Sequence, residues 1–195
     1  FDYPVRYAAR VALSLPTWLT PRARSRFPRA AWRVSDYATP KQRIDYLMEM
    51  AREGACCNPV IRALARQLSA PNPRDTIRAI MAFVQSRPYL PDPPGIEEFQ
   101  PIDWTLKHGG DCEDLNTLTA ALVIAAGFHE ELKWLDQPKA ALNHVTSYVW
   151  LNGRPLWTES SIRGADLGED PYVAADRLDQ MEVLGARREI KTETN

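Results

Sequence analysis

The clearest pattern of hydrophobic and polar positions begins just after residue 112. Apolar side chains recur there at steps of three and four residues, at Leu115, Leu118, Leu122 and Ala125. This spacing is typical of one face of an α-helix, and Gly127 follows where helices commonly end on a glycine. Asp111 suits the N-cap position. The pattern therefore predicts a buried helix with Cys112 in its first turn.

Further helices are predicted before this one. Thr39-Pro40 and Asn58-Pro59 each join a capping side chain to a proline that suits the first helical position. A third helical pattern runs from Arg74 to Ser86, with its inner face at Ile77, Ile80, Met81 and Val84. A proline-rich connection then spans residues 88–104. Because a loop of this length in a compact domain is usually functional, we expect it to form one wall of a cleft.

After Gly127 the period changes to that of β-strands. Leu132 and Trp134 alternate with polar residues, and residues 143–151 alternate clearly. Asn152-Gly153 is a strong two-residue hairpin turn, after which residues 154–160 return as a strand. Helices followed by antiparallel strands indicate an α+β domain.

The hairpin turn fixes the pairing of the two strands. With Asn152-Gly153 as the loop, Tyr148 lies opposite Trp157, Thr146 opposite Glu159, and His144 opposite Ser161. Side chains alternate between the two faces of a strand, so His144, Thr146, Tyr148 and Trp150 share one face with Glu159. A residue diagonal to another across a ladder is within reach of a long side chain. If the helix that begins at Cys112 packs on this same face, the three groups meet there.

These three residues form a candidate nucleophilic site. The unpaired N–H groups at a helix start favour a thiolate at Cys112, and His144 can serve as its base, oriented by Glu159. Two plainer interpretations are that Cys112 packs in the core and that His144 is a satisfied core residue. Zinc binding by Cys112, His144 and Glu159 is a third interpretation, but no CxxC or HxxxH spacing supports it.

The same residues resemble the transglutaminase-like cysteine peptidase superfamily, including its copies in phages and prophages. The resemblance covers about residues 74–162 and is carried by Gly110-Asp111-Cys112-Glu113-Asp114, Asn143-His144-Val145, Trp157-Thr158-Glu159 and Tyr89-Leu90-Pro91-Asp92-Pro93. It implies a papain/transglutaminase-like core, with helices packed on an antiparallel sheet and the nucleophile at the N-terminus of a buried helix. Glu159 stands where that family more often has Asp.

The resemblance also implies acyl transfer on a peptide or amide bond. Cys112 would attack a carbonyl, His144 would carry the proton and Glu159 would orient His144. The backbone N–H of Cys112 is the expected oxyanion donor, with Tyr89 or Trp104 as candidates for a second. Water as acceptor gives a protease or amidase, and an amine gives a transglutaminase. Asp111, Glu113 and Asp114 oppose thiolate formation, and we expect Asp114 to cap or form a salt bridge.

The charge distribution bears on possible partners. Of 195 residues, 24 are Lys or Arg and 25 are Asp or Glu. Residues 1–45, however, hold nine basic side chains against three acidic ones. We therefore expect a basic, proline- and aromatic-containing arm at 1–40, with a short helix at 5–15, a transglutaminase-like domain at 41–164, and a polar extension at 165–195 with a helix at 173–184.

Arm and extension suggest contacts with other protein subunits, in addition to a protein or peptide substrate. This favours an alternative function, a catalytically silent scaffold within a phage particle. Arginine content alone leaves nucleic-acid binding open. His108 and His129 have no partner pattern and are expected at the surface.

The three cysteines and the hydropathy complete the expectations. Cys56 and Cys57 are adjacent and are not expected to bridge, so a reducing, cytoplasmic compartment or a virion is expected. No stretch is apolar enough to span a bilayer, and the start at Phe1 without a methionine suggests truncation or processing. No cofactor or metal is expected.

Overall fold

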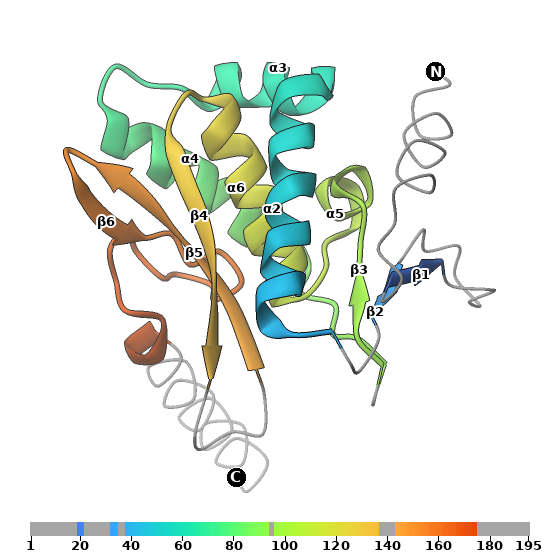
Figure 1. The fold of residues 1–195 in the computed structure, drawn as a ribbon. Helices are drawn as coiled ribbons and strands as arrows, with labels where there is room; N and C mark the ends of the chain where they lie inside the picture. The colour runs from blue at the N-terminus through green and yellow to red at the C-terminus, as the bar shows by residue number, and fades with distance from the viewer. Residues whose placement is uncertain (1–18, 22–31, 35–37, 94–95, 137–142, 175–195) are drawn as a thin grey trace, which may run out of the picture.

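The computed structural model describes residues 19–21, 32–34, 38–93, 96–136 and 143–174. These residues form an α+β fold in which helices pack against antiparallel strands (Figure 1). The helices are α2 (Pro40–Cys57), α3 (Pro59–Leu68), α4 (Pro73–Gln85), α5 (Ile102–His108) and α6 (Cys112–Ala125). The strands are β1 (Leu19–Pro21), β2 (Trp32–Val34), β3 (Glu98–Phe99), β4 (His129–Asp136), β5 (Asn143–Leu151) and β6 (Arg154–Trp157).

The predicted helix starts are confirmed, and side-chain caps explain them. Thr39 and Gln42 form a reciprocal capping box ahead of α2. Asn58 and Asn72 each accept hydrogen bonds from backbone N–H groups in the first turns of α3 and α4. A proline occupies an early position in all three helices. Among the described residues, no helix is both long enough and apolar enough to cross a membrane.

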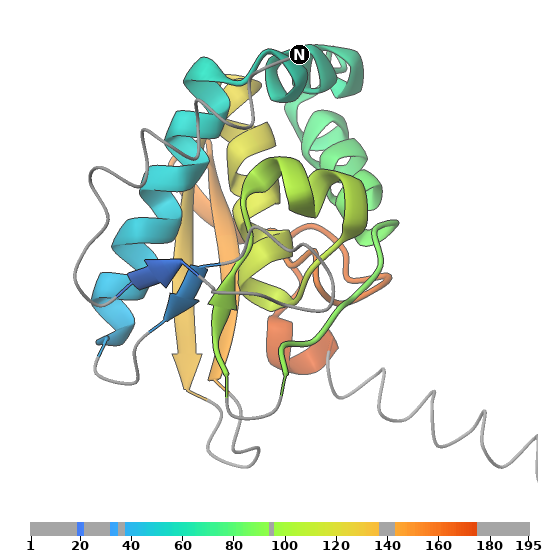
Figure 2. The same ribbon diagram turned by 90° about the vertical axis from the view of Figure 1, so that its right-hand side faces the viewer.

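Helix α6 is the centre of the fold. It contacts α2, α3, α4 and α5 as well as β4 and β5, and Figures 1 and 2 show it between the surrounding helices and the strands. Every residue from Cys112 to Val123 is buried. The predicted buried helix is confirmed, although burial extends around the whole helix. Each fully buried leucine contributes about 1.5–3 kcal/mol by leaving water.

Strands β4, β5 and β6 form one antiparallel sheet in that order. The predicted register is confirmed along the hairpin, where Tyr148 pairs with Trp157 and Leu151 with Arg154. Asn152 and Gly153 have φ values of 53° and 73°, as a primed hairpin turn requires. Strand β6 ends at Trp157, so the expected pairing of Thr146 with Glu159 lies beyond the strand ladder.

The expected packing face of this sheet is wrong. Val145 and Val149, which alternate with the predicted set, join the core with the leucines of α6. Trp150 instead is 39% exposed. The apolar β-branched side chains suit close packing on a helix, whereas the aromatic side chains with polar tips remain at the surface. His144 is instead linked to α6 through Glu159, which bonds both to His144 and to Asn116 of α6.

A second sheet joins the segment expected as an arm to the proline-rich connection. Strand β2 pairs with β1 on one side and with β3 on the other, antiparallel in both cases (Figure 2). The sequence did not predict these strands because two or three residues are too few to show alternation. The expected helix at 5–15 and nearly all of that at 173–184 lie outside the described residues.

Cys56 and Cys57 form a disulfide, which corrects the expectation that they do not bridge. The pair lies at the end of α2, and the chain leaves helical geometry at the next residue, Asn58. Cys112 is the free cysteine. The disulfide removes the support that the cysteines gave to a reducing compartment.

Candidate active site

Two glycines deliver the chain to Cys112. A Cβ on Gly109, whose φ is +88°, would lie 2.0 Å from the carbonyl oxygen of Pro88. The backbone of Gly110 pairs with residues 88–90 through hydrogen bonds to Leu90 and Pro88. The connection and the nucleophile motif are therefore held edge to edge. Asp111 is the N-cap residue as predicted, but its side chain makes no capping hydrogen bond.

The Cys112 thiol lies in surroundings that oppose ionisation. Cys112 is 9% exposed, and its Sγ donates to Glu113 Oε2 at 3.1 Å. Burial raises the pKa of the thiol well above its ordinary value, and the negative charges of Glu113 and Asp111 raise it further. A hydrogen bond from the Val145 backbone acts in the opposite direction. The expected preference for thiolate is outweighed, because desolvation and like charge exceed the effect of the helix start.

His144 and Glu159 form a close pair. His144 Nε2 lies 2.7 Å from Glu159 Oε2, with the imidazole 12% exposed and the carboxylate fully buried. Burial acts to raise the pKa of Glu159, but hydrogen bonds from His144, Ser161 and Asn116 outweigh it, and the pKa is lowered. Glu159 is therefore a buried carboxylate held ionised by donors. Because the Nε2 atom of His144 bonds to Glu159, Nδ1 is the ring nitrogen that could exchange a proton with a thiol.

The edge of β5 links the turn that carries Cys112 to the His144–Glu159 pair. Thr158 N–H donates to the Ser147 carbonyl at 2.9 Å, which is the last rung between β5 and the chain after β6. Val145 lies one rung further along β5, where β6 no longer pairs with the strand. Side chains of α6 bond to the β5 backbone there instead. The Val145 carbonyl accepts from Asn116 Nδ2 at 2.9 Å, and the Val145 backbone bonds to Cys112. The structure thus brings Cys112 beside the residue that follows His144.

A cluster of carboxyl groups joins the first turn of α6 to the proline-rich connection. Asp92, Glu97 and Glu113 have carboxylate oxygens within 4.8 Å of one another. Burial raises the pKa of Glu113 to about 8, helped by the charges of Glu97 and Asp114. All-oxygen ligands suit a hard divalent cation. Across the described parts of the chain, this is the group that could hold a metal ion, and Cys112, His144 and Glu159 form no such group.

The other residues singled out from the sequence have distinct places. Asp114 accepts from the Gln100 backbone at 2.7 Å, and it also bonds to the backbone of Asp111, the N-cap residue of α6, which is a capping contact. Tyr89 is half exposed, and the pKa of its phenol is raised chiefly by burial, with the neighbouring acidic groups Cys112 and Asp111 adding to the effect. Tyr89 therefore borders the nucleophile. Trp104 instead stacks on His108 with ring centroids 4.1 Å apart.

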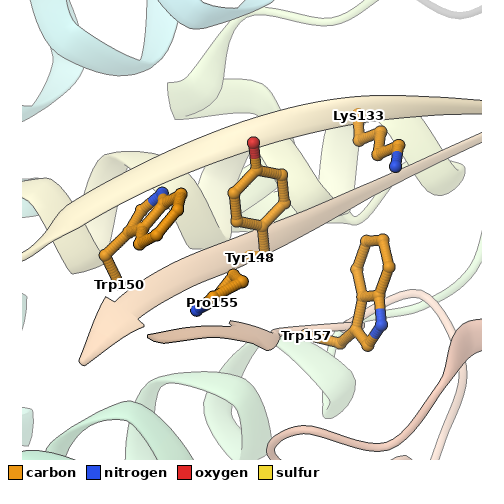
Figure 3. Close-up of a pocket in the computed structure, with 5 residues that line it drawn as sticks. All are labelled: Lys133, Tyr148, Trp150, Pro155 and Trp157. Carbon is orange, nitrogen blue, oxygen red and sulfur yellow. The ribbon is translucent and has the colours of Figure 1, made fainter. Parts of the chain in front are cut away.

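A separate pocket lies on the outer face of the sheet. It has a volume of about 440 Å³ and is lined by Lys133, Tyr148, Trp150, Pro155 and Trp157. Figure 3 shows these side chains standing on the strands, with helices behind the sheet. Tyr148 meets both tryptophans edge to face. His129 lies nearby at the surface, as predicted, 2.8 Å from Glu131.

Sequence reasoning missed two groups at the site. Asn116 bonds to Glu159 and to the β5 edge, and its signal was a polar residue one helical turn after Cys112, on the same side of the helix. Asp92 and Glu97 approach Glu113 from an irregular loop, for which the sequence carries no spacing signal. Comparison of the chain with protein-family models, with curated proteins and with solved structures gave no match.

Proposed function

We propose that this protein carries out cysteine-dependent acyl transfer on a peptide or amide bond. The observation that supports it most is the 2.7 Å contact between His144 and Glu159, one residue from the Val145 backbone that bonds to Cys112. This supports a mechanism in which Cys112 is the nucleophile, His144 the base and Glu159 the orienting acid, the set of roles that acyl transfer needs. The proposal includes a papain/transglutaminase-like core, in keeping with the resemblance of the sequence motifs to that superfamily.

The reaction begins with the thiol and the neutral imidazole. His144 accepts the thiol proton while Cys112 Sγ bonds to the carbonyl carbon, and the carbonyl π electrons move to oxygen. The Cys112 backbone N–H, at the start of α6, is the donor for that oxyanion. Collapse of the intermediate breaks the C–N bond, and the leaving amine takes the proton from His144. Water or a second amine then attacks the thioester while His144 takes its proton. Collapse of this intermediate breaks the C–S bond, and Cys112 recovers the proton from His144.

The acidic surroundings shape this mechanism. Because burial and the charges of Glu113 and Asp111 raise the thiol pKa, the resting pair is thiol and imidazole rather than an ion pair. Proton transfer therefore accompanies attack, as in general-base catalysis. Glu159 contributes by stabilising the imidazolium that forms during the step.

A catalytically silent scaffold is the second candidate. The observation that favours it is the raised thiol pKa at a buried Cys112, which slows any thiol chemistry. In that case the His144–Glu159 pair serves packing, and the function lies in contacts with other protein subunits. Protein or peptide recognition is common to both proposals.

A generic acyl donor tests the proposal without knowledge of the substrate. We would treat the protein with p-nitrophenyl acetate, quench early and measure the intact mass and the acylated residue. The proposal predicts one acetyl group on Cys112, absent in Cys112→Ala and formed more slowly in His144→Ala. His129→Ala is the matched control, since His129 also pairs with a carboxylate but has no cysteine beside it. Acetylation independent of His144 would favour the scaffold.

A further inference from the structure

We propose that Asn116 is the positioning residue of the candidate triad, holding Glu159 in register with His144 and the first turn of α6 against the edge of β5. This inference rests on the proposed function and adds to it a residue that touches neither the thiol nor the imidazole in any contact described above.

The bonding of Asn116 joins three parts of the chain. Its side chain is completely buried, and Nδ2 lies 3.0 Å from the Cys112 carbonyl, 2.9 Å from the Val145 carbonyl and 3.2 Å from Glu159 Oε1. Its Oδ1 accepts from the Ser160 N–H at 3.0 Å. One amide therefore links the nucleophile turn, the strand carrying the base and the segment carrying the acid.

The chemistry at this position requires an amide. Three acceptors face one end of the side chain and a backbone N–H faces the other, so only a group with a donor and an acceptor satisfies both. An aspartate would place a second carboxylate against Glu159. An alanine would leave buried polar groups without partners, which is costly in a water-excluded site.

Asn116 affects function through the orientation and the charge of the Glu159 carboxylate. Glu159 uses Oε2 for His144 and Oε1 for Asn116 and Ser161, with the Ser161 backbone 2.7 Å away. Donors on Oε1 fix the plane of the carboxylate and thereby the direction of Oε2. They also keep the carboxylate ionised against burial. Removing Asn116 therefore weakens the ion pair that stabilises a protonated His144.

The test follows the titration of the His144 ring by NMR in a Cys112→Ser background, where no thiol chemistry intervenes. We expect the midpoint of His144 to fall in Asn116→Ala by about half a unit or more, a several-fold change in proton affinity. Asn116→Ser is the second variant, because its hydroxyl can bond back to the Cys112 carbonyl within the helix without reaching Glu159, and it should show the same fall. His108 and His129 should titrate unchanged.

Thr119→Val is the matched control. Thr119 is also fully buried on α6, and its hydroxyl bonds to the Leu115 carbonyl within the helix. This variant should perturb the helix and leave the His144 midpoint unchanged. The inference is overturned if folded Asn116 variants titrate like the parent. It is also overturned if both fail to fold while Thr119→Val folds, because Asn116 is then a structural residue.

This test separates the inference from the proposed function. If Asn116 variants shift the His144 titration but His144→Ala does not slow Cys112 acylation, the positioning of His144 stands and the acyl-transfer proposal fails. If acylation depends on His144 while the Asn116 variants titrate normally, the proposed function stands and the inference fails.

Discussion

Asp114 occupies the space beside Gly110. A methyl group on Gly110 would lie 2.4 Å from both the Cβ and the Oδ2 of Asp114. Asp114 cannot yield easily, because it is fully buried and accepts a hydrogen bond from the Gln100 backbone at 2.7 Å. The Gly-Asp-Cys motif therefore depends on a glycine for close packing beside the nucleophile turn.

Gly110→Ala should destabilise the protein by about 1–3 kcal/mol, the usual cost of overpacking. Urea denaturation of both proteins measures the difference in free energy of unfolding. Gly127→Ala is a useful control, since no heavy atom lies within 4 Å of its added Cβ and only its φ of +93° causes strain. A Gly110→Ala protein as stable as the parent would contradict the tight packing described here.

Glu113→Gln should speed alkylation of Cys112 in alkaline solution. The pKa of Glu113 is raised to about 8, so the side chain is largely neutral below that pH and negative above it. Once ionised, it raises the pKa of the thiol. The amide removes this charge, and we expect an increase of up to about tenfold at about pH 9, with little change at about pH 7. Stopped-flow alkylation measures both rates, and an equal effect at the two values would exclude this explanation.

Glu130 should make stability fall as the solution becomes more alkaline. It is buried on β4, and burial raises its pKa to about 8, while hydrogen bonds from Thr158 and Ser147 act against the shift. Because the folded carboxyl binds its proton more tightly than the unfolded one, its contribution is complete below about pH 4.5 and is lost as pH rises through about 8.

The parent protein should lose free energy of unfolding between about pH 5 and 9, and Glu130→Gln should reduce that loss by up to about 4 kcal/mol. Chemical denaturation at a series of pH values measures it. Glu131→Gln is the neighbouring control, because Glu131 is more exposed and its pKa is lowered by hydrogen bonds from Tyr148 and His129. An unaltered pH profile in Glu130→Gln would show that the carboxyl is ionised in the folded protein.

The disulfide predicts a definite thiol count. Unfolded without reductant, the purified protein should show one reactive thiol, which is Cys112, and three after reduction. Peptide mapping would place the linkage on Cys56 and Cys57. Three thiols in the unreduced, freshly unfolded protein would contradict the bridge at the end of α2.

Local signals predicted much of this fold. Asn152-Gly153 determined the hairpin register because its positive φ values suit a two-residue turn. Thr39 and Asn58 marked helix starts because their side chains bond to free backbone N–H groups. The sheet face could not be predicted, because the valines and the aromatic residues are both strand formers and packing decides between them.

The site itself was predicted in part. Cys112, His144 and Glu159 were selected from their order and the hairpin register, and the structure places His144 on Glu159. The link between the Cys112 turn and this pair was missed. It depends on the point where β6 stops pairing with β5 and the Asn116 side chain bonds to the β5 backbone instead. The sequence has no pattern that marks where the pairing of two strands ends.

The most direct test of the account is the rate of Cys112 alkylation by iodoacetamide from about pH 5 to 9, with His144→Ala and His129→Ala in parallel. EDTA in the buffer keeps the acidic cluster of Asp92, Glu97 and Glu113 free of cations. If the His144–Glu159 pair serves Cys112, alkylation near neutral pH should slow about tenfold or more in His144→Ala and remain unchanged in His129→Ala. Equal rates in all three proteins would contradict the account and leave a scaffold in which the three residues only pack together.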